Sequence, residues 1–225
     1  TYFKVMEGKE SPEGKNLSKG VATSMWVPPN YTPRGSLAHL AAAVKKVVNV
    51  PVIAVCGITP EMGNEILKKK EADFIAIGRQ IIADPDYAAK IAIGEPETIR
   101  RCLRCNECLG EVMRSCGISC AVNPEAGKEY ESFTRVTPPT NKKKVAVIGA
   151  GPAGMQATLT AAERGHEVTL FEKNDRLGGA LYYVSIPDFK LDYRDYTNYL
   201  IHAVQKCGAT IKTGTEVTVD TIKNG

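Results

Sequence analysis

The chain has 225 residues, of which 43% are hydrophobic and 24% are charged, and its formal net charge is +4. These values are ordinary for a globular protein, and no apolar run reaches the roughly 18 residues that a membrane-spanning helix needs. The mild, dispersed charge also lacks the clustered basic residues with interleaved aromatics that nucleic-acid binding would require.

The first hundred residues alternate between helix-like and strand-like patterns. Thr59 and Pro60 are typical of a helix N-cap and a first helical position. Strands that alternate with helices in this way are expected to be parallel and covered by the helices. The expected elements are helices over 35–48, 59–70 and 80–91 and buried strands over 50–55 and 74–77.

Both strands end in glycine: Gly57 follows the first, and Gly78 with Arg79 follows the second. The phosphate site of a TIM barrel uses the loops after strands seven and eight together with a short extra helix. An arginine in such a loop would pair with the phosphate dianion. The same residues fit an ordinary strand-to-helix turn with a surface arginine, so both interpretations stay open at this point.

Five of the seven cysteines lie in one segment that has no clear periodicity. Cys102, Cys105 and Cys108 form C-x2-C-x2-C, and Cys116 and Cys120 follow. Three thiols at this spacing suit one side of a four-iron, four-sulfur (4Fe-4S) cluster, with a fourth thiolate from a more distant loop. A zinc site, which usually takes two separated cysteine pairs, and buried inert thiols are the alternatives. Spacing leaves the fourth ligand open between Cys116 and Cys120.

A nucleotide-binding signature follows a linker-like stretch rich in proline and lysine. An apolar strand at 145–148 leads into a G-x-G-x-x-G turn and a helix, and a second strand at 168–172 ends in Glu172. In the Rossmann motif the glycines allow a tight turn and close approach to a pyrophosphate, while the acid accepts hydrogen bonds from a ribose. The residues of the turn are Gly149, Ala150, Gly151 and Gly154.

The turn by itself does not distinguish FAD from NAD. Gly178 and Gly179 form a second glycine pair after the strand, where a longer ligand such as FAD could pass. A further helix over 193–208 and a strand over 210–218 are expected to follow.

Several segments, in one order, resemble the iron–sulfur flavoenzymes related to old yellow enzyme. That family includes 2,4-dienoyl-CoA reductase, enoate reductase, the bile-acid-inducible flavin oxidoreductases and trimethylamine dehydrogenase. The resemblance extends from about Pro28 to the end of the chain. It is carried by the segments PPNYTPRG, PVIAVCGI, ADFIAIGRQIIADPD, CLRCNECL, SCAVNP and VAVIGAGPAG with the later FEK and LGG.

The resemblance implies an α/β chain in three parts. Residues 1–100 would be the C-terminal part of an FMN-binding TIM barrel, 101–135 an iron–sulfur segment, and 136–225 the N-terminal part of a Rossmann-like domain for FAD or NAD(P). Gly57, Gly78 and Arg79 would lie at the FMN phosphate. The cluster would be held by Cys102, Cys105, Cys108 and Cys120, and FAD by Gly149, Ala150, Gly151, Gly154, Glu172 and Gly179.

The family also implies an activity. Electrons would pass from NAD(P)H through FAD and the 4Fe-4S cluster to FMN, which reduces an activated C=C bond of an enoate, dienoyl-CoA or steroid enone. An amine dehydrogenase, in which electrons leave the substrate, is one alternative. A bare electron-transfer piece and a zinc-stabilised nucleotide-binding module without a redox role are others.

Two departures from the family bear on the site. Cys56 precedes Gly57 where the family commonly has Gly-Gly or Gly-Arg, which weakens the assignment of the FMN phosphate contacts. The family's catalytic Tyr would lie before Thr1, and the role of its catalytic His is either vacant in this chain or also lies before Thr1. No catalytic residue is therefore assigned, and Trp26 and Tyr31 are candidates for the substrate side. We expect an internal piece of a longer cytoplasmic enzyme, inactive alone, which acts on a small molecule and could form a homo-oligomer.

Overall fold

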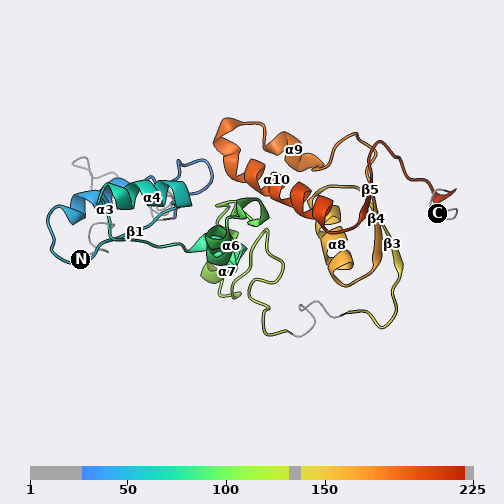
Figure 1. The fold of residues 1–225 in the computed structure, drawn as a ribbon, viewed down its shortest axis with the longest axis horizontal. Helices are drawn as coiled ribbons and strands as arrows, with labels where there is room; N and C mark the ends of the chain where they lie inside the picture. The colour runs from blue at the N-terminus through green and yellow to red at the C-terminus, as the bar shows by residue number, and fades with distance from the viewer. Residues whose placement is uncertain (1–26, 132–137, 221–225) are drawn as a thin grey trace. The chain divides into compact units, whose positions relative to one another are not determined.

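A computed structural model describes residues 27–131 and 138–220 of the chain (Figure 1). These residues form two compact units: residues up to Arg79 with Arg104–Asn106, and Gln80–Leu103 with the residues from Glu107 onward. Each unit contains one parallel sheet, so the α/β class is confirmed. The helices and strands are α3 (Ala38–Lys45), β1 (Ile53–Ala54), α4 (Pro60–Lys68), β2 (Phe74–Ile75), α5 (Arg79–Ala83), α6 (Tyr87–Ile93), α7 (Glu107–Met113), β3 (Lys144–Ile148), α8 (Pro152–Glu163), β4 (Glu167–Phe171), α9 (Ala180–Val184), α10 (Leu191–Lys206) and β5 (Thr210–Lys212), with short 3-10 helices at Pro96–Thr98 and Asp188–Lys190.

The first unit packs α3 and α4 against the pair β1–β2. Its small core consists of Ala54, Ile58, Ile66 and Ala72, with Met62 and Ile75 packed against it. Helix α4 begins where the sequence predicts, because the Thr59 hydroxyl accepts a hydrogen bond from the Met62 N–H at 3.3 Å and Pro60 occupies the first turn.

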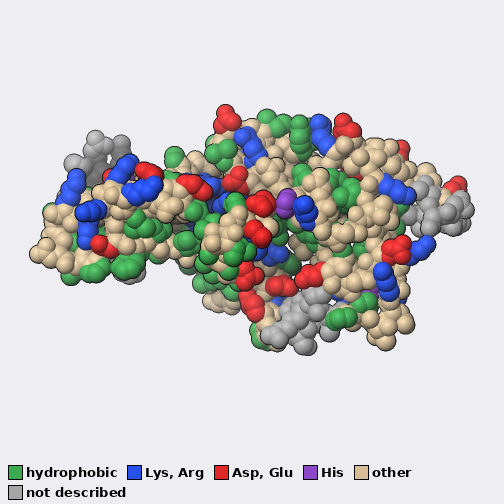
Figure 2. Space-filling model, viewed as in Figure 1, with side chains coloured by type: hydrophobic (Ala, Val, Ile, Leu, Met, Phe, Trp, Pro, Cys, Tyr) green, Lys and Arg blue, Asp and Glu red, His purple; other side chains and the backbone are tan. Residues whose placement is uncertain are grey.

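The opposite face of this strand pair is apolar and open. Ile53 pairs with Phe74 across the two strands, and these side chains are 57% and 59% exposed. Figure 2 shows apolar side chains at the surface of the first unit. The described residues therefore cover one face of the β1–β2 pair with helices and leave the other uncovered.

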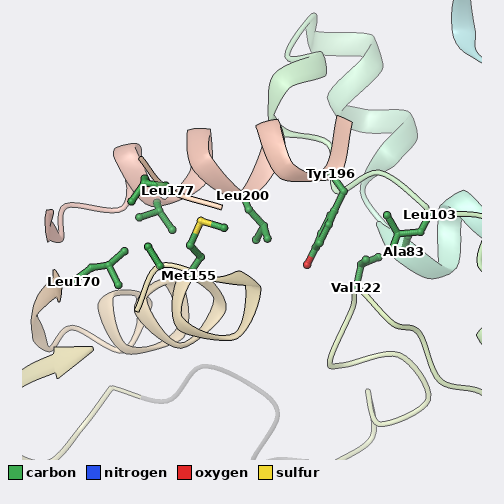
Figure 3. Packing of buried hydrophobic residues seen from close by; sticks show 10 residues of the cluster. Ala83, Leu103, Val122, Met155, Leu170, Leu177, Tyr196 and Leu200 are labelled. Atoms are coloured by element: carbon green, nitrogen blue, oxygen red, sulfur yellow. The ribbon is translucent and has the colours of Figure 1, made fainter. Parts of the chain in front are cut away.

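The second unit is built on the parallel sheet β3–β4–β5, with β4 in the centre. Helix α8 packs on β3 and β4, and α10 packs on α8. Figure 3 shows Met155 of α8, Leu170 of β4 and Leu200 of α10 meeting in the core, where all three are fully buried. The core continues to Ala83, Leu103 and Val122, so the parts of the cysteine segment around Cys102 and Cys120 belong to the same folded unit as the sheet.

Several predicted boundaries in the first hundred residues are wrong. The strands expected over 50–55 and 74–77 contain only two residues each, Ile53–Ala54 and Phe74–Ile75. Helix α3 is shorter than predicted and buries none of its residues, because no described element packs on its outer apolar side. The single helix expected over 80–91 is split into α5 and α6 at Pro85, which lacks an N–H and restricts the residue before it.

The later elements are closer to expectation. Strand β3 and helix α10 lie within two residues of the predicted positions, while β4 ends at Phe171, so Glu172 follows the strand rather than closing it. Strand β5 covers only the first three residues of the range predicted for it. Helix α7 is not predicted, because its seven residues lie inside the segment interpreted as a cysteine-rich loop, and Gly110 interrupts the pattern of Leu109, Val112 and Met113.

Within the described ranges, no helix is both long enough and apolar enough to span a bilayer. On the face drawn in Figure 2, acidic and basic side chains lie beside one another, in keeping with the weak net charge.

Candidate functional site

The glycine-rich turn joins β3 to α8 and has the geometry expected of a pyrophosphate-binding turn. Gly149 has φ +94°, a region that favours glycine, and no heavy atom lies within 4 Å of a Cβ built at Gly149 or Gly151. A Cβ at Gly154 would overlap the carbonyl oxygen of Gly149, so this position requires glycine. Gly151 is the N-cap of α8, and no described side chain caps it. The turn therefore leaves space and helix N–H groups where a phosphate would bind.

The carboxylate of Glu172 is part of this turn. Its Oε2 accepts a hydrogen bond from the Ala150 N–H at 2.7 Å, and its Oε1 accepts from the N–H and the side-chain amide of Asn174 at 2.9 and 2.7 Å. The hydrogen bond from the Asn174 N–H is the main cause of a lowered pKa for Glu172. Glu172 is only 6% exposed, and its oxygens already accept from protein donors. Contact between this acid and a ribose stays a prediction.

The second glycine pair lies directly against the turn. The Gly178 N–H donates to the Ala150 carbonyl at 2.9 Å, and a Cβ at Gly179 would lie 2.9 Å from the Cα of Gly151. Two motifs that are separated in sequence are therefore brought together, as the FAD interpretation requires. The geometry fits a dinucleotide, although it does not distinguish FAD from NAD.

The cysteine segment contributes to both units. Cys105 belongs to the first unit, while Cys102, Cys108 and Cys120 belong to the second. Within the second unit, Cys102 and Cys120 both pack against the core that contains Ala150 and Met155. No cysteine among the described residues forms a disulfide, so the donor set has the chemistry that a thiolate-bound metal needs.

The structure does not gather a complete metal site. In the part of the chain that it describes, no three His, Cys, Asp or Glu side chains lie close enough to hold a metal ion. The ligand assignment therefore rests on spacing and on the resemblance. Cys116, the extra cysteine, is exposed after α7, whereas Cys120 packs on the core beside Tyr196, whose pKa is raised to about 12 mainly by burial.

The predicted phosphate end of the first unit contains Gly57, Gly78 and Arg79. Gly57 has φ +66°, a conformation that favours glycine. Cys56 before it has φ +98°, which is unusual for a residue with a side chain and would suit a glycine at position 56 as well. Gly78 has open space at its Cβ position. Burial raises the pKa of the Cys56 thiol, while the charge of Arg79 partly opposes that shift.

Two further residues lie at this end, and the motif analysis missed both. Asn106 accepts a hydrogen bond from the Arg79 guanidinium through Oδ1 and donates to the Val27 carbonyl at 2.9 Å. Arg104 lies beside Gly57 and donates to the Thr32 carbonyl at 2.8 Å. Both stand between cysteines in the CLRCNEC string, where no sequence pattern distinguishes a phosphate-side residue from a spacer. Two guanidinium groups near an open glycine loop fit a phosphate.

Other candidates are less informative. Tyr31 is 66% exposed, and Trp26 lies outside the described residues, so the substrate-side assignment remains untested. Cys207 donates its S–H to the Val204 carbonyl at the end of α10, and Gly208 follows with φ +82°, as expected for a helix C-terminus.

Comparison with known proteins assigns the two segments separately. Residues 22–98 match the NADH:flavin oxidoreductase / NADH oxidase family, and residues 147–201 match an NAD(P)-binding Rossmann-like domain. An NADH oxidase of Thermoanaerobacter brockii is 39% identical over 92% of this chain and 32% of its own length. A metal reductase of Desulforamulus reducens is 41% identical over 84% of this chain and 28% of its own length. A cinnamate reductase of Clostridium sporogenes is 36% identical over 87% of this chain and 30% of its own length.

Solved structures agree with these matches. A 2-naphthoyl-CoA reductase in complex with 2-naphthoyl-CoA superposes with a TM-score of 0.81 and 32% identity, over 87% of this chain and 30% of that one. A 6-hydroxypseudooxynicotine amine oxidase from Pseudomonas geniculata superposes with the same TM-score of 0.81 and 29% identity, over 88% of this chain and 31% of that one. The chain spans less than a third of the length of the curated relatives it matches. Over residues 22–98 the chain is therefore similar to the NADH:flavin oxidoreductase / NADH oxidase family, and a Rossmann-like segment follows at residues 147–201.

Proposed function

We propose that this chain is part of an NAD(P)H-dependent flavin and iron–sulfur oxidoreductase that reduces activated C=C bonds. The observation that supports it best is the single core of the second unit. Cys102 and Cys120 pack against the core that contains Ala150 of the dinucleotide turn and Met155 of α8. A redox centre on those cysteines would thus belong to the same folded body as the nucleotide-binding turn.

The proposal includes three cofactors and the domain division at residues 100 and 135, the second of which lies outside the described residues. Bound FMN, FAD and 4Fe-4S cluster would supply hydride and one-electron chemistry between NAD(P)H and the substrate. The chain's own residues would bind and orient these groups. Gly57, Gly78, Arg79 and Arg104 would hold the FMN phosphate, Gly149, Ala150, Gly151, Gly154, Glu172 and Gly179 the FAD, and Cys102, Cys105, Cys108 and Cys120 the cluster.

The names of two relatives support this substrate class. The cinnamate reductase and the 2-naphthoyl-CoA reductase are named for conjugated carboxylic acids or their thioesters. An enoate, a dienoyl-CoA or a steroid enone would present the same activated double bond. The amine oxidase match supports the second candidate, an amine dehydrogenase, in which electrons flow from the substrate.

The test begins with protein purified without oxygen as part of its full-length enzyme. Iron, acid-labile sulfide, zinc, FMN and FAD are quantified, and NADH and NADPH oxidation is then followed with cinnamate and with an enoyl-CoA. Four iron atoms, both flavins and alkene-dependent oxidation would support the proposal. Activity only with amines and an artificial acceptor would favour the dehydrogenase. Stoichiometric zinc in place of iron and sulfide would overturn the redox assignment.

A further inference from the structure

Asn174, two residues after the acid of the dinucleotide site, joins that acid to the segment that follows β5. It belongs to none of the sequence motifs. It lies in the second unit, as do the residues with which it forms hydrogen bonds.

The main chain of Asn174 is held by the segment after β5. Its carbonyl accepts a hydrogen bond from the Gly214 N–H at 2.7 Å. Before it, the Glu172 N–H donates to the Lys212 carbonyl, and the Glu172 carbonyl accepts from the Thr215 N–H, both at 2.9 Å. Gly214 has φ +62°, a conformation that favours glycine. The pairing of β4 with β5 therefore continues beyond the ends of both strands, as far as Asn174.

Asn174 directs two donors to the same oxygen of the acid. Its N–H and its side-chain amide donate to Oε1 of Glu172 at 2.9 and 2.7 Å. A carboxylate oxygen has two lone pairs, so these two donors occupy Oε1 completely. Among the described residues, Oε2 has one donor, the Ala150 N–H at 2.7 Å. The carboxylate therefore retains one acceptor position for a ligand, on the oxygen that is bonded to the glycine-rich turn.

The same donors keep the Glu172 carboxylate charged. The Asn174 N–H is the largest cause of the lowered pKa of Glu172, and the Ala150 N–H and the Asn174 side-chain amide act in the same direction, while burial opposes them. A fixed negative charge attracts a hydroxyl donor and repels a phosphate group. The carboxylate beside the turn therefore favours a ribose with a free 2′-hydroxyl.

We infer that Asn174 is a positioning residue of the dinucleotide site: it fixes the Glu172 carboxylate so that Oε2 accepts one hydroxyl of an adenosine ribose and a 2′-phosphate is excluded. This inference rests on the proposed function, since it requires a dinucleotide at the turn. FAD and NAD share the adenosine half, so the inference applies to either. Asn174 is exposed, so its replacement leaves the buried core of the unit unchanged.

The experiment uses the full 225-residue chain, freed of bound nucleotide. Asn174→Ala removes the side-chain amide and keeps the N–H, and Asn174→Leu does the same at a similar side-chain size. Asn198→Ala is the matched control, because Asn198 is also exposed and lies on α10 of the same unit.

Calorimetric titration measures the Kd of each protein for ADP-ribose and for 2′-phospho-ADP-ribose, which differ only in the 2′-phosphate. FAD and NAD are titrated as well, and the tighter of the two identifies the dinucleotide that the site takes. Thermal unfolding without ligand measures stability, and the carboxyl NMR signal of Glu172 is followed against pH.

We expect both Asn174 variants to bind ADP-ribose and the preferred dinucleotide about 3-fold to 10-fold more weakly, the effect of one hydrogen bond. Binding of 2′-phospho-ADP-ribose should change less, because the repelling carboxylate is no longer held in place, so the preference between the two probes falls. The pKa of Glu172 should rise toward its ordinary 4.5. The thermal midpoint should stay close to that of the wild type, and Asn198→Ala should change none of these readouts.

An unchanged preference between the two ADP-ribose probes in both Asn174 variants would overturn the inference while leaving the proposed function intact. Equal weakening in Asn198→Ala would also overturn it, because the effect would then not depend on the contact with Glu172. So would a wild-type chain that binds both ADP-ribose probes equally well. A wild-type chain that binds neither FAD, NAD nor ADP-ribose would instead count against the proposed function itself.

Discussion

The two units differ in how much of their own structure they stabilise. The first has a core of four small or medium residues, and it exposes Ile53 and Phe74 on its strands by more than half. The second has ten buried core residues, among which Leu170 and Leu200 have no exposed surface. The second unit can therefore position its motifs by its own packing, while the strand face of the first is left without cover by the described residues.

This difference bears on the candidate sites. The dinucleotide turn is held by Ala150, Glu172 and Gly178 through hydrogen bonds within one unit. At the phosphate end, Gly78 has open space at its Cβ position, and Arg79 and Arg104 donate hydrogen bonds to carbonyls of the loop over residues 28–32. We therefore expect the nucleotide turn to be pre-organised for its ligand. We expect the phosphate end, at Gly57, Gly78 and Arg79, to depend on structure beyond the described residues of the first unit.

The largest expected effect is the loss of a core side chain in the second unit. Leu200→Ala should cost about 2–5 kcal/mol of unfolding free energy, because it leaves a cavity at a fully buried site. Phe74→Ala, at a 59% exposed site in the first unit, should change it by less than about 0.5 kcal/mol. Urea unfolding followed by peptide-resolved hydrogen exchange would measure both. Similar losses would contradict the contrast between the units.

The dinucleotide turn offers a sharper comparison between two glycines. Gly154→Ala should cost about 1–3 kcal/mol, because its Cβ would overlap main-chain atoms that cannot move freely. Gly151→Ala has open space and should preserve the thermal midpoint while reducing the amount of flavin that copurifies. Thermal unfolding and flavin content separate the two effects. Normal flavin content in Gly151→Ala would argue against a pyrophosphate at this turn.

Glu172 links the stability of the second unit to pH. Glu172→Gln should cost about 1.5–3 kcal/mol at pH 7, the range for hydrogen bonds to a charged group. The carboxyl pKa is lowered in the folded state from its ordinary 4.5, so its stabilisation is present above that value and is lost as pH falls through the lowered pKa. Denaturant unfolding between pH 7 and pH 3 should show the two proteins converge on acidification. Exposed Glu216→Gln is the control, and a pH-independent difference would refute the linkage.

The smallest effect concerns the N-cap of α4 in the first unit. Thr59→Ala should lose about 1 kcal/mol, whereas Thr59→Ser retains the hydroxyl that accepts from the Met62 N–H. Hydrogen exchange should report faster opening of α4 and no change in α8 or α10. If the alanine variant loosened α8 as well, the two units would not be independently stabilised.

Local patterns predicted the parts of the fold that depend on near neighbours in the chain. The cap at Thr59, the turn at Gly149 and the break of α10 near Gly208 follow from backbone preferences of those residues. The extent of β1 and β2 could not be predicted, because strand length depends on pairing partners distant in sequence. The contacts of Arg104 and Asn106 could not be predicted either, since they arise only when separate segments meet.

The sequence by itself determined the alternating α/β pattern, the positions of the glycines in the turn and the cysteine spacing, because these depend on side-chain type and local order. Only the tertiary structure decided that Glu172 accepts from Ala150 and that Gln80 holds the Cys102 N–H. Hydrogen bonds over about twenty residues of separation need the chain to be folded back on itself. That folding is driven by burial of the shared core, which local sequence patterns do not specify.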